Sequence, residues 1–182
     1  MDTQVLYLIL GLFVLFIIFL YNKTISLRNE VKNSFLQENI ELKRKMDLIP
    51  VLESITEKYL SHEKSTFVEV VEARNQLKDL LEKKPREKMT EEENIKINSL
   101  DKIISSSFKN MFALVESHPE LKSNEAAARL MEDITSSENR ISFSRQNIAE
   151  SIVEYNTHIQ SFPNLILAKL FNFTAFDYKI NE

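Results

Sequence analysis

The sequence predicts an all-α protein in which an N-terminal transmembrane helix continues into an antiparallel three- to four-helix bundle with a long first helix. The 182-residue chain contains one Gly, at position 11. So few residues suited to tight turns and bulges disfavour a sheet-rich fold. Apolar residues recur at three- and four-residue steps over most of the chain, which is typical of amphipathic helices. The chain also begins with a long uncharged apolar run.

Residues 3–21 contain no charged side chain. A helix of that length is about 28 Å long, close to the hydrocarbon thickness of a bilayer. We expect residues 1–22 to form an uncleaved anchor, because the run lacks the basic start and the small-residue cleavage site of a signal peptide. The residues predicted to span the membrane are Val5, Leu6, Tyr7, Leu8, Ile9, Leu10, Gly11, Leu12, Phe13, Val14, Leu15, Phe16, Ile17, Ile18, Phe19 and Leu20.

Basic residues flank this run on one side only. Lys23, Arg28 and Lys32 follow it, and no Lys or Arg precedes it. Lys and Arg near a span favour the cytoplasmic side. We therefore expect a single-pass protein of the cell membrane, with its N-terminus outside and its C-terminal domain in the cytoplasm.

Residues 23–182 are predicted to form one helical bundle domain. Its first helix continues from the membrane segment, and its apolar stripe extends to Leu81. We interpret Pro50 as a kink rather than a loop, because the apolar spacing holds across it. Residues 61–65 form a second weak point, where the stripe lapses. The excess length of this helix is expected to extend as a stalk or to pair with another copy as a coiled coil.

The next elements are marked by caps and prolines. A charged stretch over about residues 82–94 is the first predicted loop. Thr90 and Glu93 form a capping box, so a second helix should begin there. This helix should end near His118, because the residue before Pro119 is pushed out of the α region.

A third helix is predicted to end at Pro163 and to begin at a cap formed by Ser123 or Asn124. Ser137 and Ser144 fall on its apolar stripe, where small residues would let a neighbouring helix approach closely. Two further segments are expected, a short fourth helix over residues 165–171 and an aromatic tail over residues 171–182.

Composition argues against several functions. With 23 basic and 27 acidic residues the net charge is −4, which disfavours nucleic-acid binding, since that needs a basic surface. The absence of Cys excludes disulfides and thiolate chemistry. The carboxylates are interleaved with Lys and Arg, as on solvated helix faces. These carboxylates include Glu53, Glu57, Glu69, Glu72, Glu132 and Asp133.

The three His residues offer no metal-binding pattern. His62, His118 and His158 lie far apart and form neither an H-E-x-x-H motif nor the Glu-x-x-His pairs of di-iron bundles. We expect them at the surface or at helix ends. The sequence thus predicts no catalytic, cofactor-binding or metal-binding residue and no small-molecule substrate. A basic cluster at residues 43–45 could contact anionic lipid or a partner, but the surrounding carboxylates favour an ordinary polar helix face.

Several short segments occur in an order that is specific as a combination. They are Tyr21-Asn22, Leu27-Arg28-Asn29-Glu30-Val31-Lys32-Asn33, Glu41-Leu42-Lys43-Arg44-Lys45-Met46-Asp47-Leu48-Ile49-Pro50, His62-Glu63, Phe112-Ala113-Leu114-Val115-Glu116, Pro119-Glu120-Leu121-Lys122, Glu138-Asn139-Arg140-Ile141, Tyr155-Asn156, Phe162-Pro163 and Phe171-Asn172-Phe173. With these segments the chain resembles the LemA family over essentially its whole length.

The resemblance implies a bacterial single-pass membrane protein with a helical-bundle domain and without enzyme activity. Members of the family are mostly of undefined function, and related proteins occur in membrane-organelle formation. Two residues depart from the family pattern: Phe35 stands where Trp is common, and Asn172 replaces a common Gly, so the turn of the tail could differ. Polar residues in the matching segments are interpreted as interhelical salt bridges rather than a site. They are Arg44, Asp47, Glu138, Asn139 and Arg140.

Three functions are compatible with this pattern. The leading hypothesis is a non-enzymatic scaffold or adaptor at the cytoplasmic face of the membrane, which contacts the lipid bilayer and binds a protein partner or another copy of itself. The second is an extracytoplasmic sensor whose bundle binds a ligand, and the third is an accessory factor of a membrane protein-quality-control system. A hydrolase or metal enzyme is disfavoured, since no chemical constellation is apparent.

Overall fold

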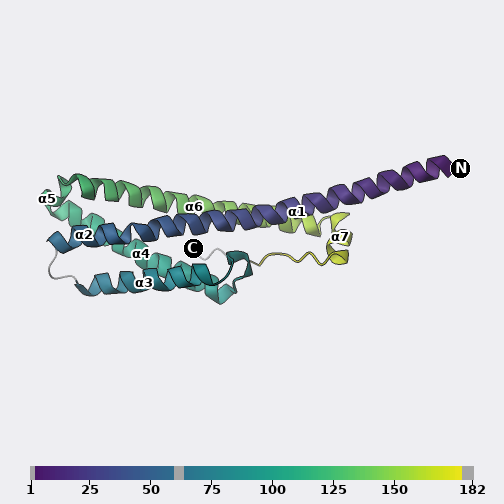
Figure 1. Ribbon diagram of the computed structural model, residues 1–182. Coiled ribbons are helices and arrows are strands. Elements are labelled where there is room, and N and C mark those ends of the chain that lie inside the picture. Colours follow the sequence, from purple (N-terminus) through teal and green to yellow (C-terminus); the bar gives the residue numbers. More distant parts are fainter. Residues whose placement is uncertain (1–2, 60–63, 178–182) are drawn as a thin grey trace.

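The protein is almost entirely helical (Figure 1). The computed structural model describes residues 3–59 and 64–177, and these residues contain no strand. The predicted fold class, an all-α bundle with a long N-terminal helix, is confirmed. The elements are α1 (Thr3–Asp47), α2 (Ile49–Tyr59), α3 (Lys64–Lys83), the 3-10 helix η1 (Arg86–Lys88), α4 (Glu91–Ser117), α5 (Pro119–Lys122), α6 (Glu125–Gln160) and α7 (Asn164–Leu170).

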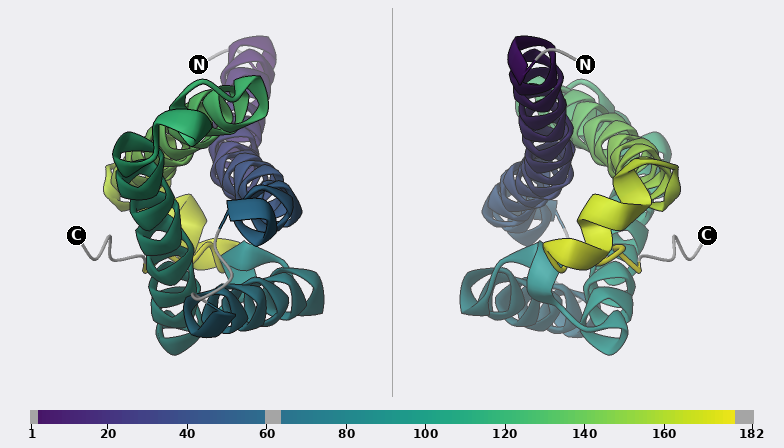
Figure 2. Two further views of the ribbon diagram at one scale, coloured as in Figure 1. Left: turned by 90° about the vertical axis from the view of Figure 1, so that its left-hand side faces the viewer. Right: turned by 90° about the vertical axis from the view of Figure 1, so that its right-hand side faces the viewer.

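Long helical rods pack side by side in the described part of the chain (Figure 2). α1 and α2 form one rod, α6 lies along it, and α3 and α4 form a hairpin beside this pair. α1 and α6 are antiparallel, because polar pairs between them progress in opposite directions along the two helices. These pairs are Thr24–His158, Ser34–Ser151, Glu38–Arg145 and Lys45–Glu138.

The helical rod is interrupted for one residue between α1 and α2, beside Pro50. The regular helix is interrupted at Leu48 and resumes at once. Pro50 has no backbone N–H to donate to the carbonyl of Met46, four residues earlier. The Nε atom of Arg74 on α3 donates to that carbonyl at 3.2 Å instead. The carbonyl that Pro50 leaves without a backbone donor is therefore satisfied by a side chain from a neighbouring helix, and the chain continues as a helix across Pro50 without a loop.

The first helix does not extend to Leu81. The chain reverses between α2 and α3, and α3 then returns along the bundle and packs against α4 (Figure 1). The prediction of one helix with a mere weak point at residues 61–65 was wrong, because no Gly or Pro marks the reversal in the sequence. His62 lies outside the described residues.

The apolar stripes meet in two clusters. The larger joins the end of α1 to α2, α3, α4, α5 and α6, and Leu77, Ile104 and Phe108 lie at its centre. The smaller joins α1, α6 and α7 around Val31 and Tyr155. Burying one large apolar side chain contributes roughly 1.5–3 kcal/mol, so these clusters dominate the stability of the bundle.

The predicted start of the second long helix, α4, is confirmed. The hydroxyl of Thr90 accepts a hydrogen bond from the backbone N–H of Glu93, and the Glu93 carboxylate accepts one from the backbone N–H of Thr90 at 2.8 Å. Lys84 lies 2.6 Å from the same carboxylate. Hydrogen bonds from Lys84 and from the backbone of Thr90 lower the pKa of Glu93 from 4.5 to about 2.

Replacing the cap should destabilise the bundle moderately. We expect Thr90→Ala to lower the free energy of unfolding by about 1 kcal/mol, because backbone N–H groups at the start of α4 lose an acceptor. Urea titration followed by circular dichroism measures this loss. Ser99→Ala is the control, since the exposed Ser99 hydroxyl donates only to a carbonyl of its own helix. A loss for Thr90→Ala no larger than that for Ser99→Ala would contradict the prediction.

Caps also define α6 and α7. Asn124, rather than Ser123, caps α6 by accepting from the N–H groups of two following residues. At the end of α7, Asn172 has a φ of 56°, and the N–H of Phe173 donates to the carbonyl of Ala168 at 2.9 Å. This is the left-handed helix termination that Gly usually provides. Asn tolerates this conformation better than most residues, so the replacement of the common Gly preserves a tight turn.

The part of the tail up to Asp177 is held against α6. The side-chain amide of Asn156 donates to the carbonyl of Phe176 at 2.9 Å and accepts from its N–H at 3.0 Å. The hydroxyl of Tyr155 donates to the carbonyl of Thr174 at 3.2 Å. The tail is thus fixed by specific hydrogen bonds as well as by aromatic packing between Tyr155 and Phe176.

The first part of α1 projects beyond the bundle (Figure 1). Its stretch of high hydropathy is long and apolar enough to cross a bilayer, and only 6% of that stretch is buried. The exposed large apolar side chains between Val5 and Phe19 are 47% to 72% accessible. No described protein element covers this surface. By contrast, Leu20 and Thr24 are buried where α1 enters the bundle.

Candidate functional site

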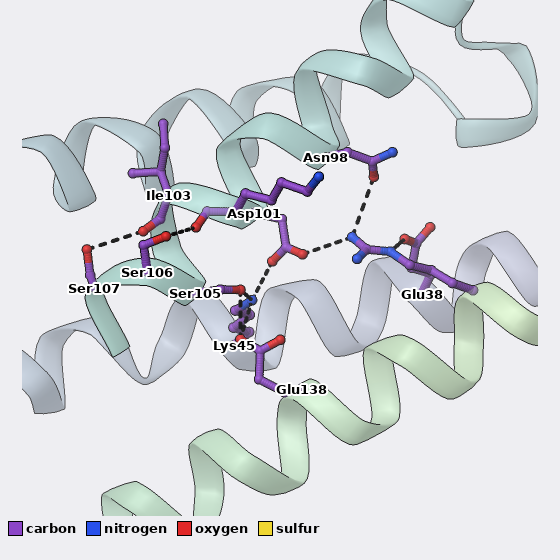
Figure 3. Close-up of polar contacts among 11 residues, drawn as sticks. Glu38, Lys45, Asn98, Asp101, Ile103, Ser105, Ser106, Ser107 and Glu138 are labelled. Atoms are coloured by element: carbon purple, nitrogen blue, oxygen red, sulfur yellow. Dashed lines mark hydrogen bonds and ion pairs between the residues drawn. The ribbon is translucent and has the colours of Figure 1, made fainter. Parts of the chain in front are cut away.

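A network of charged side chains lies inside the bundle, between α1, η1, α4 and α6. Figure 3 shows the part of it that involves Glu38, Lys45, Asp101 and Glu138. Glu38 is 0% exposed, and its carboxylate pairs with two arginines: Nη2 of Arg86 at 3.0 Å and Nε of Arg145 at 3.0 Å. Arg145 reaches on to Asp101, with 2.8 Å between Nη2 and Oδ2. Glu38 therefore links a 3-10 helix to two long helices.

The second half of the network centres on Lys45. Its Nζ lies 2.6 Å from Oδ1 of Asp101 and 2.7 Å from Oε1 of Glu138. The same nitrogen donates to the hydroxyl of Ser105 at 2.6 Å, and that hydroxyl donates to Glu138 at 2.8 Å. Figure 3 shows Lys45 approached by Asp101, Ser105 and Glu138. All three hydrogens of the Lys45 ammonium group thus have acceptors.

The charges balance across the network. It contains three cations, Arg86, Arg145 and Lys45, and three carboxylates, which belong to Glu38, Asp101 and Glu138. Burial disfavours the charged form of Arg145, but the charges of Asp101 and Glu38 outweigh burial and raise its pKa above the ordinary value.

The guanidinium group of Arg86 is buried with few polar partners. This residue is about 1% exposed, and its Nε, Nη1 and Nη2 atoms have no hydrogen-bond partner among the described residues, so its contact with Glu38 is an ion pair without hydrogen-bond geometry. Its guanidinium carbon lies 6.0 Å from the centre of the Phe35 ring, within the range of a cation–π contact. Among the described residues, the Glu38 carboxylate is the ionic partner of Arg86, and the ring of Phe35 lies beside the same guanidinium group.

A balanced, buried network of this kind chiefly selects one packing arrangement. Removing one member leaves an uncompensated charge in a low-dielectric interior. Because the members come from α1, η1, α4 and α6, sliding one helix along another would separate several pairs at once. We assign the network the role of fixing helix alignment.

A separate groove opens on the outer surface between α1 and α6. It has a volume of about 380 Å³. Glu41 on its wall is 2% exposed and accepts hydrogen bonds from Gln37 at 2.9 Å and from Arg44 at 3.0 Å. The buried hydroxyl of Ser137 has no hydrogen-bond partner among the described residues. The groove is lined by Glu41, Arg44, Asp47, Leu48, Asp133, Ser136, Ser137 and Arg140.

Exposed apolar side chains lie next to this groove in helical spacing. Ile40 precedes Arg44 by one turn and is 46% exposed, and Phe143 follows Arg140 by about one turn and is 64% exposed. A groove with charged walls and adjacent exposed apolar residues provides the mixed chemistry of a protein-binding surface.

The predicted interhelical salt bridges were correct for Glu138 alone. Glu138 pairs with Lys45 across helices, whereas Arg44 pairs with Glu41 of its own helix. Asp47 and Arg140 line the groove, and Asn139 is exposed. The burial of Ser137 and Ser144 on the α6 stripe is confirmed.

The basic cluster at residues 43–45 does not act as one surface. Lys43 is exposed, Arg44 lines the groove, and Lys45 is 1% exposed inside the network. Successive helical residues point in different directions. The alternative in which this cluster contacts lipid as a unit is therefore excluded by the direction of Lys45.

The two described His residues lie at helix ends, as predicted. His118 caps the end of α4, and its ring lies 3.1 Å from the carbonyl of Leu114. His158 lies in the last turn of α6. No group of three or more His, Asp or Glu side chains within residues 3–59 and 64–177 is arranged to hold a metal ion.

His158 joins α6 to α1. The Thr24 hydroxyl donates to the carbonyl of Leu20, so we assign the 3.0 Å contact with His158 as donation from Nε2 to Thr24. The amide of Asn164 lies 3.3 Å from the other ring nitrogen. Burial and, to a smaller extent, the charge of Lys23 lower the pKa of His158 below its ordinary value.

This lowered pKa predicts a pH-dependent stability. Between the folded pKa of His158 and the ordinary value of about 6.5, the unfolded chain binds more protons than the folded chain. The contribution that neutral His158 makes to the free energy of unfolding is therefore fully present above that pH window. It is lost as the pH falls through the window. Urea titrations between about pH 7.5 and about pH 5.5 measure the decline. His158→Gln should show a shallower decline, and an unchanged pH profile in this variant would contradict the assignment.

Fold and surface together define a class of protein, a helical bundle carried on one long helix whose first part is apolar and uncovered. The model of the LemA family matches residues 34–180 of the 182-residue chain. The chain therefore belongs to the LemA family. A search among curated proteins found no match.

Proposed function

We propose that this protein is a non-enzymatic scaffold or adaptor, anchored in the cell membrane by α1, which binds another protein or a second copy of itself through its helical surface. One observation carries the proposal: a single helix contains both the projecting apolar segment and the wall of the groove. A partner bound at the groove would be coupled rigidly to the membrane segment, because the intervening residues are helical.

The distribution of charged residues supports a binding role rather than a catalytic one. Glu38, Lys45 and Asp101 have their charges matched within the interior, so these groups contribute to packing. The groove carries both signs of charge on residues of its two facing walls, α1 and α6. Mixed charges with neighbouring apolar side chains suit recognition of a protein surface.

In the proposed topology the bundle lies in the cytoplasm. Lys23, Arg28 and Lys32 follow the apolar segment, and the bias of basic residues near a span sets its orientation. The chain has no Cys, so Lys122→Cys introduces a unique thiol at an exposed position. We expect a membrane-impermeant maleimide to label it only after the cells are permeabilised. Labelling in intact cells would place the bundle outside and favour the sensor hypothesis.

Site-specific crosslinking tests the binding role. A photo-reactive amino acid replaces Arg140 at the groove, in full-length protein with the anchor intact. The control carries the same group at Lys78, which is exposed on α3. We expect a discrete adduct, with a partner or with a second copy, from position 140 and not from position 78. Monomeric protein that gives no adduct from position 140 would overturn the proposal.

A further inference from the structure

The short helix α7 exposes large apolar side chains. Ile166 is 60% exposed and Leu170 69%, although Ala168 on the opposite side of the same helix is 5% exposed, and Phe162, two residues before α7, is 82% exposed. Leu165 and Phe171 are also exposed. Isolated exposed apolar residues are ordinary on protein surfaces, but several on one short element indicate a surface that contacts something.

The position of α7 identifies what lies opposite this surface. α7 runs across the end of the bundle from which the apolar part of α1 projects (Figures 1 and 2). The ring of Tyr21, one residue beyond the predicted span, lies 5.0 Å from the ring of Phe171 and 5.7 Å from that of Phe173. α7 is therefore at the level where α1 would leave a bilayer.

The charges at this end fit the same environment. Lys23 on α1 and Lys169 on α7 are exposed, and Lys23 also lies 3.8 Å from the carboxylate of Glu154 in a solvent-exposed ion pair. Aromatic side chains concentrate at membrane–water interfaces, and basic residues there are attracted to anionic lipid headgroups. Tyr21, Phe171 and the two lysines supply this combination at one level of the molecule.

The element is also held firmly enough to present a defined face. Ala168 packs into the smaller core cluster, and the N–H of Phe173 donates to its carbonyl at 2.9 Å. Beyond it, Asn156 fixes Phe176 through two hydrogen bonds. The exposed side of α7 is thus fixed relative to α1 by contacts on its other side.

We propose that α7 and the turn before it form a second membrane contact, which lies on the bilayer surface with Phe162, Ile166 and Leu170 inserted at the boundary between headgroups and acyl chains. The proposal rests on the anchoring role proposed above. The occupant is lipid because the surface is continuous with the lipid-facing part of α1 through the contact between Tyr21 and Phe171. With this contact the bundle end would be seated on the membrane instead of being suspended from one helix.

The absence of Trp from the chain allows a direct test. Single-Trp variants of the full-length protein are reconstituted into phosphatidylcholine–phosphatidylglycerol vesicles with either brominated or ordinary acyl chains, since bromine quenches Trp fluorescence on contact. The variants are Ile166→Trp on α7, Phe143→Trp at an exposed apolar site far along α6, and Phe13→Trp within the predicted span. Helical circular dichroism verifies that each variant folds.

We expect emission from Phe13→Trp and Ile166→Trp to fall in brominated vesicles and emission from Phe143→Trp to be equal in both. Leu170→Trp repeats the measurement at a second position and should agree with Ile166→Trp. Quenching at position 13 without quenching at positions 166 and 170 would overturn the α7 contact alone. The exposed apolar face of α7 would then be assigned to a protein partner. An unquenched Phe13→Trp would also overturn the proposal that α1 is a membrane anchor. Quenching at position 143 equal to that at position 166 would overturn the proposal that the lipid contact is specific to α7.

Discussion

Glu38→Gln is expected to decrease the free energy of unfolding by about 3–5 kcal/mol, because it leaves the buried guanidinium of Arg86 without its counter-charge. Glu38 and Arg86 are both 0% exposed at their side chains, so solvent does not screen the loss. The substitution preserves side-chain volume and changes only charge and hydrogen bonding. Urea titration of full-length protein in mild detergent, followed by circular dichroism, measures the decrease.

Two further variants show whether the unpaired cation is the cause. Glu30→Gln removes an exposed carboxylate from the same helix and should change the free energy of unfolding by about 0.5 kcal/mol or less. Adding Arg86→Met to Glu38→Gln should recover part of the loss, because the unpaired guanidinium is removed together with its partner. Equal stability of Glu38→Gln and Glu30→Gln would show that the network does not stabilise the bundle.

The second major effect concerns the projecting part of α1. Introducing Leu10→Arg together with Phe13→Arg is expected to release the protein from the membrane fraction. Each central Arg costs roughly 2.5–3.5 kcal/mol in a membrane helix, so two together would oppose insertion by about 5–7 kcal/mol. The bundle should remain folded, because these side chains contact none of its described core. Fractionation followed by alkaline carbonate extraction measures the distribution.

A matched variant separates insertion from general surface hydrophobicity. Leu36→Arg with Ile40→Arg introduces the same charges at exposed apolar positions of α1 inside the bundle region. This variant should stay with the membrane. If both double variants fractionate alike, the apolar segment is not what retains the protein there.

The fold was largely predictable because its signals are local. The capping box at Thr90, the break at Pro119 and the spacing of apolar residues each define a helix without reference to the rest of the chain. The reversal between α2 and α3 was missed, because no Gly or Pro accompanies it and the apolar spacing resumes beyond it. Spacing alone does not distinguish one long helix from two antiparallel ones.

The charged network was predictable only in part. Glu38 and Lys45 occur in the apolar stripe between Phe35, Leu42 and Met46, and Asp101 occurs similarly in the stripe of α4. A charge in an apolar stripe signals burial with a partner. Which charge it pairs with is set by the relative alignment of helices, as for Glu38 and Arg86, which are distant in sequence. Local periodicity contains no such information.

The unbroken course of α1 makes it a spacer of fixed length. From residue 21 to residue 47 the helix rises about 40 Å. For a bilayer placed across residues 3–20, the groove beside Glu41 would stand about 30 Å above the lipid surface. A partner bound there would have to reach that height above the lipid.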